Sequence, residues 1–183
     1  MTLRVRREVW NLRARRCVLP ILVAMAAAQD RFGVRIVEYS VQHNHIHMIV
    51  ECGDAASLGR AMKGLAVRIA HALNAVMGRR RGEVLDDRYH ADVLRSPRRL
   101  RYTLAYVLGN ALRHRVWRGP LPRGYVDPCS SACAFGGWCR PVHTDANAPP
   151  VISRPARSWL LGGGWRRGGG ALDPAHVPGP DAA

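Results

Sequence analysis

A formal net charge of +15 on 183 residues indicates a protein that binds a polyanion, and nucleic acid is favoured over an anionic membrane surface. The chain is long enough for one domain, or one domain with an appendage, and 48% hydrophobic residues supply a packed globular core. No apolar run reaches the roughly 18 residues of a membrane-spanning helix. We therefore expect no membrane contact and a cytoplasmic location.

Hydrophobic periodicity predicts the elements of the first half of the chain. Residues 1–6 alternate between apolar and polar side chains as a strand does, and residues 18–31 have the apolar composition of a core helix. Residues 34–41 alternate again and turn near Gln42 into a further strand that ends at Glu51. These last two strands are expected to form a hairpin.

The next part of the chain is predicted to contain two helices and one strand. Residues 57–81 repeat apolar side chains at three- and four-residue steps, and residues 89–95 read as a strand. Residues 96–117 begin as a helix, with Ser96 as N-cap and Pro97 in the first turn. The order β-α-β-β-α-β-α predicts an α+β protein of the ferredoxin-like class, with a four-stranded antiparallel sheet.

Residues 119–183 differ in composition from this core domain, residues 1–118. Ten of the twelve prolines and eleven of the eighteen glycines lie in this C-terminal extension. The extension is therefore predicted to be rich in loops. The Trp and Leu residues of 157–168 are expected to dock it on the core.

The extension also contains four potential zinc ligands, Cys129, Cys133, Cys139 and His143. Their spacing lacks the tight C-x2-C pair of common zinc motifs. Free thiols in a reducing compartment are therefore favoured, and a structural zinc site is the alternative.

Three of the eight histidines, His43, His45 and His47, alternate along the predicted third strand. Alternate side chains of a strand share one face, whereas Ile46 and Met48 lie on the other face and can be buried. Two imidazoles at i and i+2 can bind one metal ion from a rigid platform, but they make an incomplete site. A third ligand is therefore expected from another element.

One face of the predicted helix 96–117 supplies this ligand. At 100° per residue, five polar side chains fall within an arc of about 80°, namely Arg99, Tyr102, Tyr106, Asn110 and Arg113. Asn110 lies one turn after Tyr106 and two turns after Tyr102, which favours Tyr106 as the partner of a metal held by His45, His47 and Asn110. A tyrosine beside a metal and arginines is suited to attack on phosphorus, and Arg99 or Arg113 would hold the phosphate.

The segments "NHIHMIVE" and "YVLGNALRH" together resemble HUH-type single-tyrosine transposases, in particular the REP-associated tyrosine transposases of bacteria, within the transposase IS200-like superfamily. The resemblance covers about residues 1–118. In that family two histidines flank a hydrophobic residue, and a polar residue four positions after the catalytic tyrosine completes the metal site. His45, His47, Tyr106 and Asn110 match these roles.

The resemblance implies a transposase or nickase that cleaves single-stranded DNA near a hairpin with Mg2+ or Mn2+, acting as a monomer or homodimer. The products would be a 5′-phosphotyrosine and a free 3′-hydroxyl. The sequence departs from the family at Ala111, where proline is common, and in its short lead into the first strand. The short lead raises the alternative of a truncated or decayed copy.

Further basic residues are candidates for DNA contact. The polar side of the helix 57–81 and its C-terminal end carry an arginine-rich set that either contacts phosphates or is a solvated surface. With the two arginines of the later helix, the candidates are Arg60, Lys63, Arg68, Arg79, Arg80, Arg81, Arg99 and Arg113.

Two other functions remain open. A domesticated transposase would keep the DNA surface and bind hairpins without turnover. An RNA-binding module of the same fold would display aromatic side chains on its sheet, and neither of the two phenylalanines lies on a predicted strand. The basic charge, the strand order and the Tyr-x-x-x-Asn helix together favour a metal-dependent DNA transposase.

Overall fold

The computed structural model describes residues 1–114, 116–117 and 119–176, and in these ranges it contains one three-stranded antiparallel sheet. The strands are β1 (Thr2–Arg4), β2 (Arg35–Val41) and β3 (His45–Glu51), arranged in the order β1-β3-β2. The hairpin of β2 and β3 is confirmed, and β3 is the middle strand.

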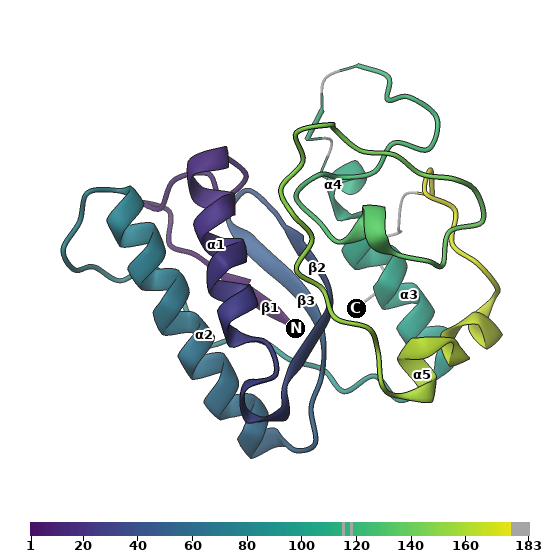
Figure 1. Cartoon of the computed structure of the whole chain (residues 1–183), viewed down its shortest axis with the longest axis horizontal. Helices are drawn as coiled ribbons and strands as arrows, with labels where there is room; N and C mark the ends of the chain where they lie inside the picture. Colours follow the sequence, from purple (N-terminus) through teal and green to yellow (C-terminus); the bar gives the residue numbers. More distant parts are fainter. Residues whose placement is uncertain (115, 118, 177–183) are drawn as a thin grey trace.

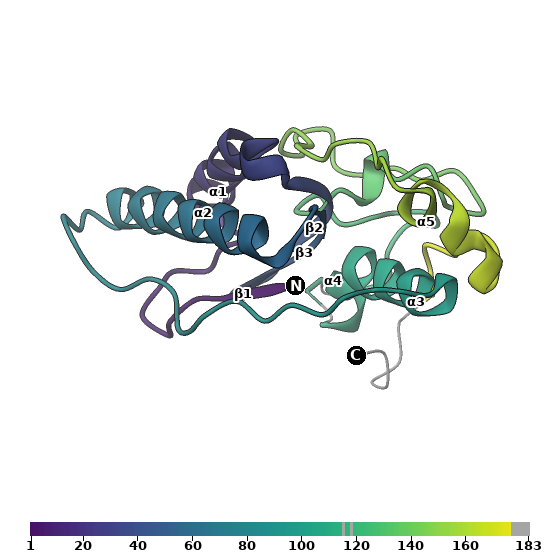
Figure 2. The ribbon, with the colours of Figure 1, turned by 90° about the horizontal axis from the view of Figure 1, so that it is seen from below.

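Helices cover both faces of this sheet (Figures 1 and 2). One layer consists of α1 (Arg15–Ala28) and α2 (Ala55–Val76), which pack against each other, and the opposite layer contains α3 (Pro97–Leu108) and α4 (Asn110–Arg113). Four shorter helices complete the described elements: η1 (Arg31–Gly33), η2 (Ala132–Ala134), α5 (Trp159–Gly162) and η3 (Gly164–Gly168).

The alternation of β3 divides the apolar core into two clusters. Ile46 and Met48 are fully buried in the cluster that contains α1 and α2, whereas Ile49 belongs to the cluster of α3 and Trp165. Since alternate residues of a strand share a face, His45 and His47 lie on the same face as Ile49. They therefore face the α3 layer.

Two helix starts follow the capping rules that the sequence indicates. The Ser96 hydroxyl accepts a hydrogen bond from the Arg99 amide at the start of α3, which confirms the predicted N-cap. Asp54 caps α2 by accepting from the Ser57 amide at 2.7 Å. No described helix is long and apolar enough to cross a membrane.

The predicted fourth strand is wrong. Within 89–95 only His90 makes a backbone bridge, to Thr2, and a second isolated bridge joins Leu85 to Val5. This segment therefore follows the free edge of β1 without forming a regular strand. The physical reason is that Ala91, Asp92 and Val93 are all exposed, so successive side chains lack the buried face that fixes a strand.

Helix boundaries also differ from the prediction. The predicted helix 96–117 is interrupted at Gly109, where the Leu112 amide bonds to the Gly109 carbonyl in a tighter turn. The helix predicted to reach residue 81 ends at Val76, because Gly78 adopts a left-handed conformation with φ of 68°. The three arginines at 79–81 therefore follow α2 in an exposed loop.

Part of the extension packs on α3, as the composition of 157–168 led us to expect. Trp165 is 2% exposed and shares a cluster with Leu100 and Leu104. A second attachment joins the extension to the start of the chain, since Arg13 donates two hydrogen bonds to the buried Asp127 carboxylate. The domain boundary at 118/119 stays a prediction.

Glu38 provides a test of this packing through pH. Burial raises the pKa of its carboxyl from 4.5 to about 7, although the hydrogen bond from Ser131 Oγ at 2.5 Å opposes the shift. The folded protein therefore binds the proton more tightly than the unfolded chain. The resulting stability is fully present below pH 4.5 and is lost as the pH rises through about 7.

We expect Glu38→Gln to remove this pH dependence. Between pH 5 and pH 8 the free energy of unfolding of the variant should increase relative to the parent by about 2 to 3 kcal/mol. Urea unfolding at both pH values measures it, with the exposed Glu8→Gln as control. A difference between variant and parent that does not change with pH would contradict a buried, protonated Glu38.

Candidate functional site

The candidate site begins with the paired imidazoles of β3. His45 and His47 have ring centroids 4.6 Å apart; His47 is 8% exposed and His45 is half-buried. The Nδ1 atom of His45 lies 2.8 Å from Asn44 Oδ1, and that of His47 lies 2.9 Å from Thr2 Oγ1.

These contacts occupy the Nδ1 atom of each ring. Because Asn44 Oδ1 only accepts, His45 Nδ1 donates the hydrogen bond, and the lone pair of the neutral ring lies on Nε2. His47 Nε2 is buried and has no hydrogen-bond partner among the described residues. Each ring is thus oriented by a hydrogen bond at Nδ1, as metal-bound histidines usually are at the nitrogen that does not bind the metal.

Burial also keeps both rings neutral. Desolvation lowers the pKa of His45 to about 4, with smaller contributions from His114 and Arg4. Desolvation lowers the pKa of His47 to about 3, helped by His45, the N-terminal ammonium and His114. Neutral imidazole is the form that binds a metal ion.

The α3 layer brings Tyr106 and two basic residues against this pair. The Tyr106 ring lies 5.1 Å from the His47 ring, and the Arg113 guanidinium lies 5.5 Å from the Tyr106 ring centroid. His114 directly follows α4, and the centroid of its ring lies 5.8 Å from that of His45.

Asn110 is the buried polar residue of this layer. It is 0% exposed, and neither atom of its amide group has a hydrogen-bond partner in the described part of the chain. Asn110 is four residues from both Tyr106 and His114, and the rings of these two residues lie against the two histidines of β3. A buried amide without partners is uncommon in proteins and points to a ligand.

The donor set fits a small divalent cation. Among the described residues no group of three His, Cys, Asp or Glu forms a metal cluster. His45, His47 and Asn110 would instead offer two imidazole nitrogens and an amide oxygen, which suit metals that accept nitrogen and oxygen ligands. The unpartnered atoms of His47 and Asn110 are the observation in favour of this fit.

Two residues near the site were missed by the sequence reasoning. His114 lies one helical turn after Asn110, so the same periodicity that selected Asn110 contained the signal for it. Thr2 lies opposite His47 because β1 pairs with β3 in that register. No sequence signal predicts this pairing.

The structure separates the predicted DNA-contacting residues into two groups. Arg99 and Arg113 lie on α3 and α4, in the layer of Tyr106. The basic residues of α2 lie in the layer on the opposite side of the sheet (Figure 2), together with the loop that follows; they are Arg60, Lys63, Arg68, Arg79, Arg80 and Arg81.

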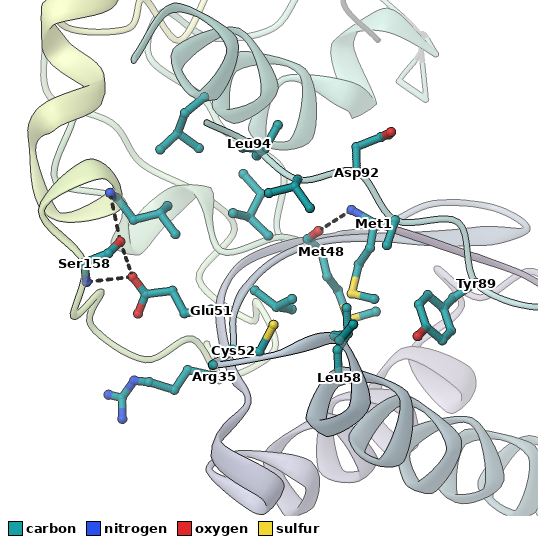
Figure 3. A pocket seen from close by; sticks show the side chains of 18 of the residues that line it. Met1, Arg35, Met48, Glu51, Cys52, Leu58, Tyr89, Asp92, Leu94 and Ser158 are labelled. Atoms are coloured by element: carbon teal, nitrogen blue, oxygen red, sulfur yellow. Dashed lines mark hydrogen bonds between the residues drawn. The ribbon is translucent and has the colours of Figure 1, made fainter. Parts of the chain in front are cut away.

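Two other features of the molecule do not form part of this site. The alternative of zinc at Cys129, Cys133, Cys139 and His143 finds no support, since no metal-binding group of this kind occurs in the ranges that the structure describes. A cavity of about 980 Å³ lies at the other end of β3, lined by Glu51 and Ser158 among others (Figure 3). His45, His47 and Tyr106 do not line it.

The fold and the site together define a class: an α+β protein whose antiparallel sheet presents two histidines to a tyrosine-bearing helix. The chain belongs to the transposase IS200-like family, whose family model matches residues 1–108. No curated protein and no solved structure matches the chain.

The unpartnered amide of Asn110 generates a stability prediction. In the presence of chelator we expect Asn110→Leu, whose side chain has the same number of heavy atoms and the same branching, to raise the free energy of unfolding by about 1 to 3 kcal/mol, because it removes a buried polar group that has no partner. Urea denaturation measures it.

Asn74→Leu is the matched control. The Asn74 side chain is also buried and its Oδ1 has no partner, but its Nδ2 donates to the Gly82 carbonyl at 2.9 Å. Asn74→Leu loses this hydrogen bond, so it should be less stable than Asn110→Leu by about 1 kcal/mol. A large loss of stability in Asn110→Leu would show that Asn110 has a structural role instead.

Proposed function

We propose that this protein is a metal-dependent single-tyrosine transposase that nicks and rejoins single-stranded or hairpin DNA through a 5′-phosphotyrosine. The observation that carries the proposal is the contact of the Tyr106 and His47 rings, together with the unpartnered buried atoms of His47 and Asn110. Membership of the transposase IS200-like family supports it.

His45, His47 and Asn110 would hold the cation, Mg2+ or Mn2+. When bound, it would polarise a phosphate oxygen and offset the charge that develops in the transition state. The support for this ligand set comes from the neutral, oriented imidazoles and from the buried amide.

The nucleophile in this proposal is the Tyr106 hydroxyl. Its oxygen forms a bond to phosphorus, the bond from phosphorus to the 3′-oxygen breaks, the phenol proton is released and the 3′-oxygen takes up a proton. Arg113 lies over the ring of Tyr106 and would bind the phosphate. The phosphotyrosine link keeps the energy of the phosphodiester, so a later 3′-hydroxyl can attack it without a nucleotide cofactor.

The DNA is proposed to be single-stranded because the resemblance to single-tyrosine transposases implies this substrate. Attack requires one of its phosphates to lie close to both Tyr106 and the ligand set. Guanidiniums near the site would position the backbone without reading bases, and Arg99 lies on the same helix. The basic residues of α2, across the sheet, would make a separate contact. The alternative is a hairpin-binding protein without turnover, and the next experiment separates the two.

Tyr106→Phe removes one oxygen and keeps the ring. We expect it to abolish a covalent protein–DNA adduct that survives denaturing gel electrophoresis, whereas Tyr102→Phe retains the adduct. The assay uses labelled hairpin oligonucleotides from the flanks of the gene. An adduct in Tyr106→Phe, or one mapped to Tyr102, would overturn the mechanism, and binding without any adduct in the parent protein would favour the inactive alternative.

Removing a ligand should separate metal binding from DNA binding. We expect His47→Ala and Asn110→Ala each to abolish detectable Mn2+ binding in calorimetry and to stop cleavage while most DNA affinity remains, because the cation acts on the transition state. Chelator should have the same effect on the parent protein. His43→Ala is the control, since His43 is exposed outside the β3 pair; unchanged Mn2+ affinity in both ligand variants would refute this site.

A further inference from the structure

The most exposed aromatic side chain of the described extension is Trp159. It is 61% exposed at the first position of α5 and lies outside the residues that the family model matches. A single exposed apolar side chain is common on protein surfaces, so exposure alone does not indicate a partner. The surroundings of Trp159 indicate which partner it fits.

Both the backbone before Trp159 and its indole ring have fixed contacts. Glu51, the last residue of β3, accepts hydrogen bonds from the amides of Arg157 and Ser158 at 2.8 Å each, and from the Ser158 hydroxyl at 2.6 Å (Figure 3). The ring lies directly on Gly164, since a Cβ at that position would meet ring atoms at 2.7 to 2.8 Å. Trp159 is therefore a fixed platform on the end of β3.

The charge around this platform is positive. Residues 146–172 contain four arginines and no acidic residue. The Arg167 guanidinium lies 5.2 Å from the centroid of the Trp159 ring. In the described part of the chain, Arg157 and Arg167 are exposed and neither forms a salt bridge.

The same surface continues onto α3. Arg101 donates hydrogen bonds to the carbonyls of Gly170 and Ala171 at 3.0 and 3.1 Å, which attaches the segment after η3 to this helix. Residues 93–113, which include α3 and α4, contain five arginines and again no acidic residue. The platform and the candidate site thus lie on two packed segments whose own charged side chains are all basic, although Asp30 pairs with Arg154 and Asp92 with Arg99.

We propose that Trp159, with Arg157 and Arg167, forms a second contact for single-stranded DNA, in which one base stacks on the indole ring and the guanidiniums bind flanking phosphates. Stacking on a fixed aromatic ring within a positive surface is how proteins hold single strands without sequence preference. A duplex is excluded as the ligand because its bases are already stacked. The choice of DNA rests on the proposed function.

The distance between the two contacts suits one continuous strand. Glu51 is six residues from His45 along β3, a separation of about 20 Å at 3.3 Å per residue. A strand whose phosphate lies at Tyr106 would reach Trp159 after a few nucleotides. The extension would therefore lengthen the bound segment of DNA.

The test is a double-mutant cycle between the indole and a base. Fluorescence anisotropy measures the Kd of the full-length protein for an oligothymidylate of about 20 nucleotides, intact or with a single abasic site moved along it. We expect Trp159→Ala to weaken binding of the intact strand by at least about fivefold, the lower end of the stacking range. At one position the abasic site should weaken DNA binding by the parent protein about as much as Trp159→Ala weakens binding of the intact strand. The same abasic site should hardly change the Kd of Trp159→Ala.

Two further variants test whether the loss of affinity is specific to the ring of Trp159. Trp159→Phe retains a ring and should recover most of the affinity. Trp10→Ala removes another exposed tryptophan that has an arginine over it, Arg16 at 3.9 Å, but lies outside the extension, and it should bind within twofold of the parent protein. Binding of Trp159→Ala within twofold of the parent, or an abasic penalty equal in both proteins, would overturn the proposal.

The adduct assay distinguishes this inference from the proposed function. At saturating DNA, Trp159→Ala should still form the Tyr106 adduct, because it loses affinity and no reacting group. Dependence on Trp159 without an adduct in the parent protein would retain the stacking contact and reject the chemistry. An adduct in the parent protein, with DNA binding that does not depend on Trp159, would retain the chemistry and reject the stacking contact.

Discussion

The central position of β3 is the constraint on which the rest of the structure depends. Its neighbours on both edges fix its register, and its apolar residues Ile46 and Met48 are buried against α1 and α2. A shift by one residue would turn these apolar side chains out of their core. The burial of one face therefore fixes the histidines on the other, and the site is positioned by packing that takes place across the sheet.

The candidate site carries an energetic cost. His47 Nε2 and both polar atoms of the Asn110 amide are buried without partners, and each such group destabilises the fold by roughly 1 to 3 kcal/mol. Two packed clusters, one on each face, offset this cost. The break at Gly109 ends α3 at Leu108, so that Asn110 begins a separate short helix.

Local periodicity was enough to predict which side chains share a face, and this explains what the sequence could reveal. His45 and His47 alternate on one strand, so their shared face follows from spacing alone. Tyr106 and Asn110 are four residues apart, but the break at Gly109 places them on different helices, which spacing did not predict. The contact of His47 with Tyr106 does not follow from spacing, because it depends on α3 lying on the face of the sheet that carries the histidines. The hydrogen bond between Thr2 Oγ1 and His47 Nδ1 depends on strand register, which periodicity does not contain.

The errors have a related cause. Residues 89–95 carry strand-forming side chains, but only tertiary packing reveals that Ala91, Asp92 and Val93 lack a buried face. The basic side of α2 was predicted correctly as polar, yet which side of the sheet it occupies depends on how the loop after β3 turns. Pattern alone thus predicts faces, whereas the assembly of faces into one site depends on long-range connections.

The two ends of β3 give the extension a physical relation to the candidate site. His45 begins the strand and Glu51 ends it, and Glu51 binds the start of α5 through three hydrogen bonds. β3 pairs with β2 from end to end and with β1 over His45–His47, so groups attached to its two ends are joined by one hydrogen-bonded strand. Arg13 and Asp127 make a second, buried attachment, so the extension is connected to the sheet domain at more than one place. A DNA strand bound at both ends of β3 would therefore meet a surface whose spacing is already set before binding, which lowers the entropic cost of holding it.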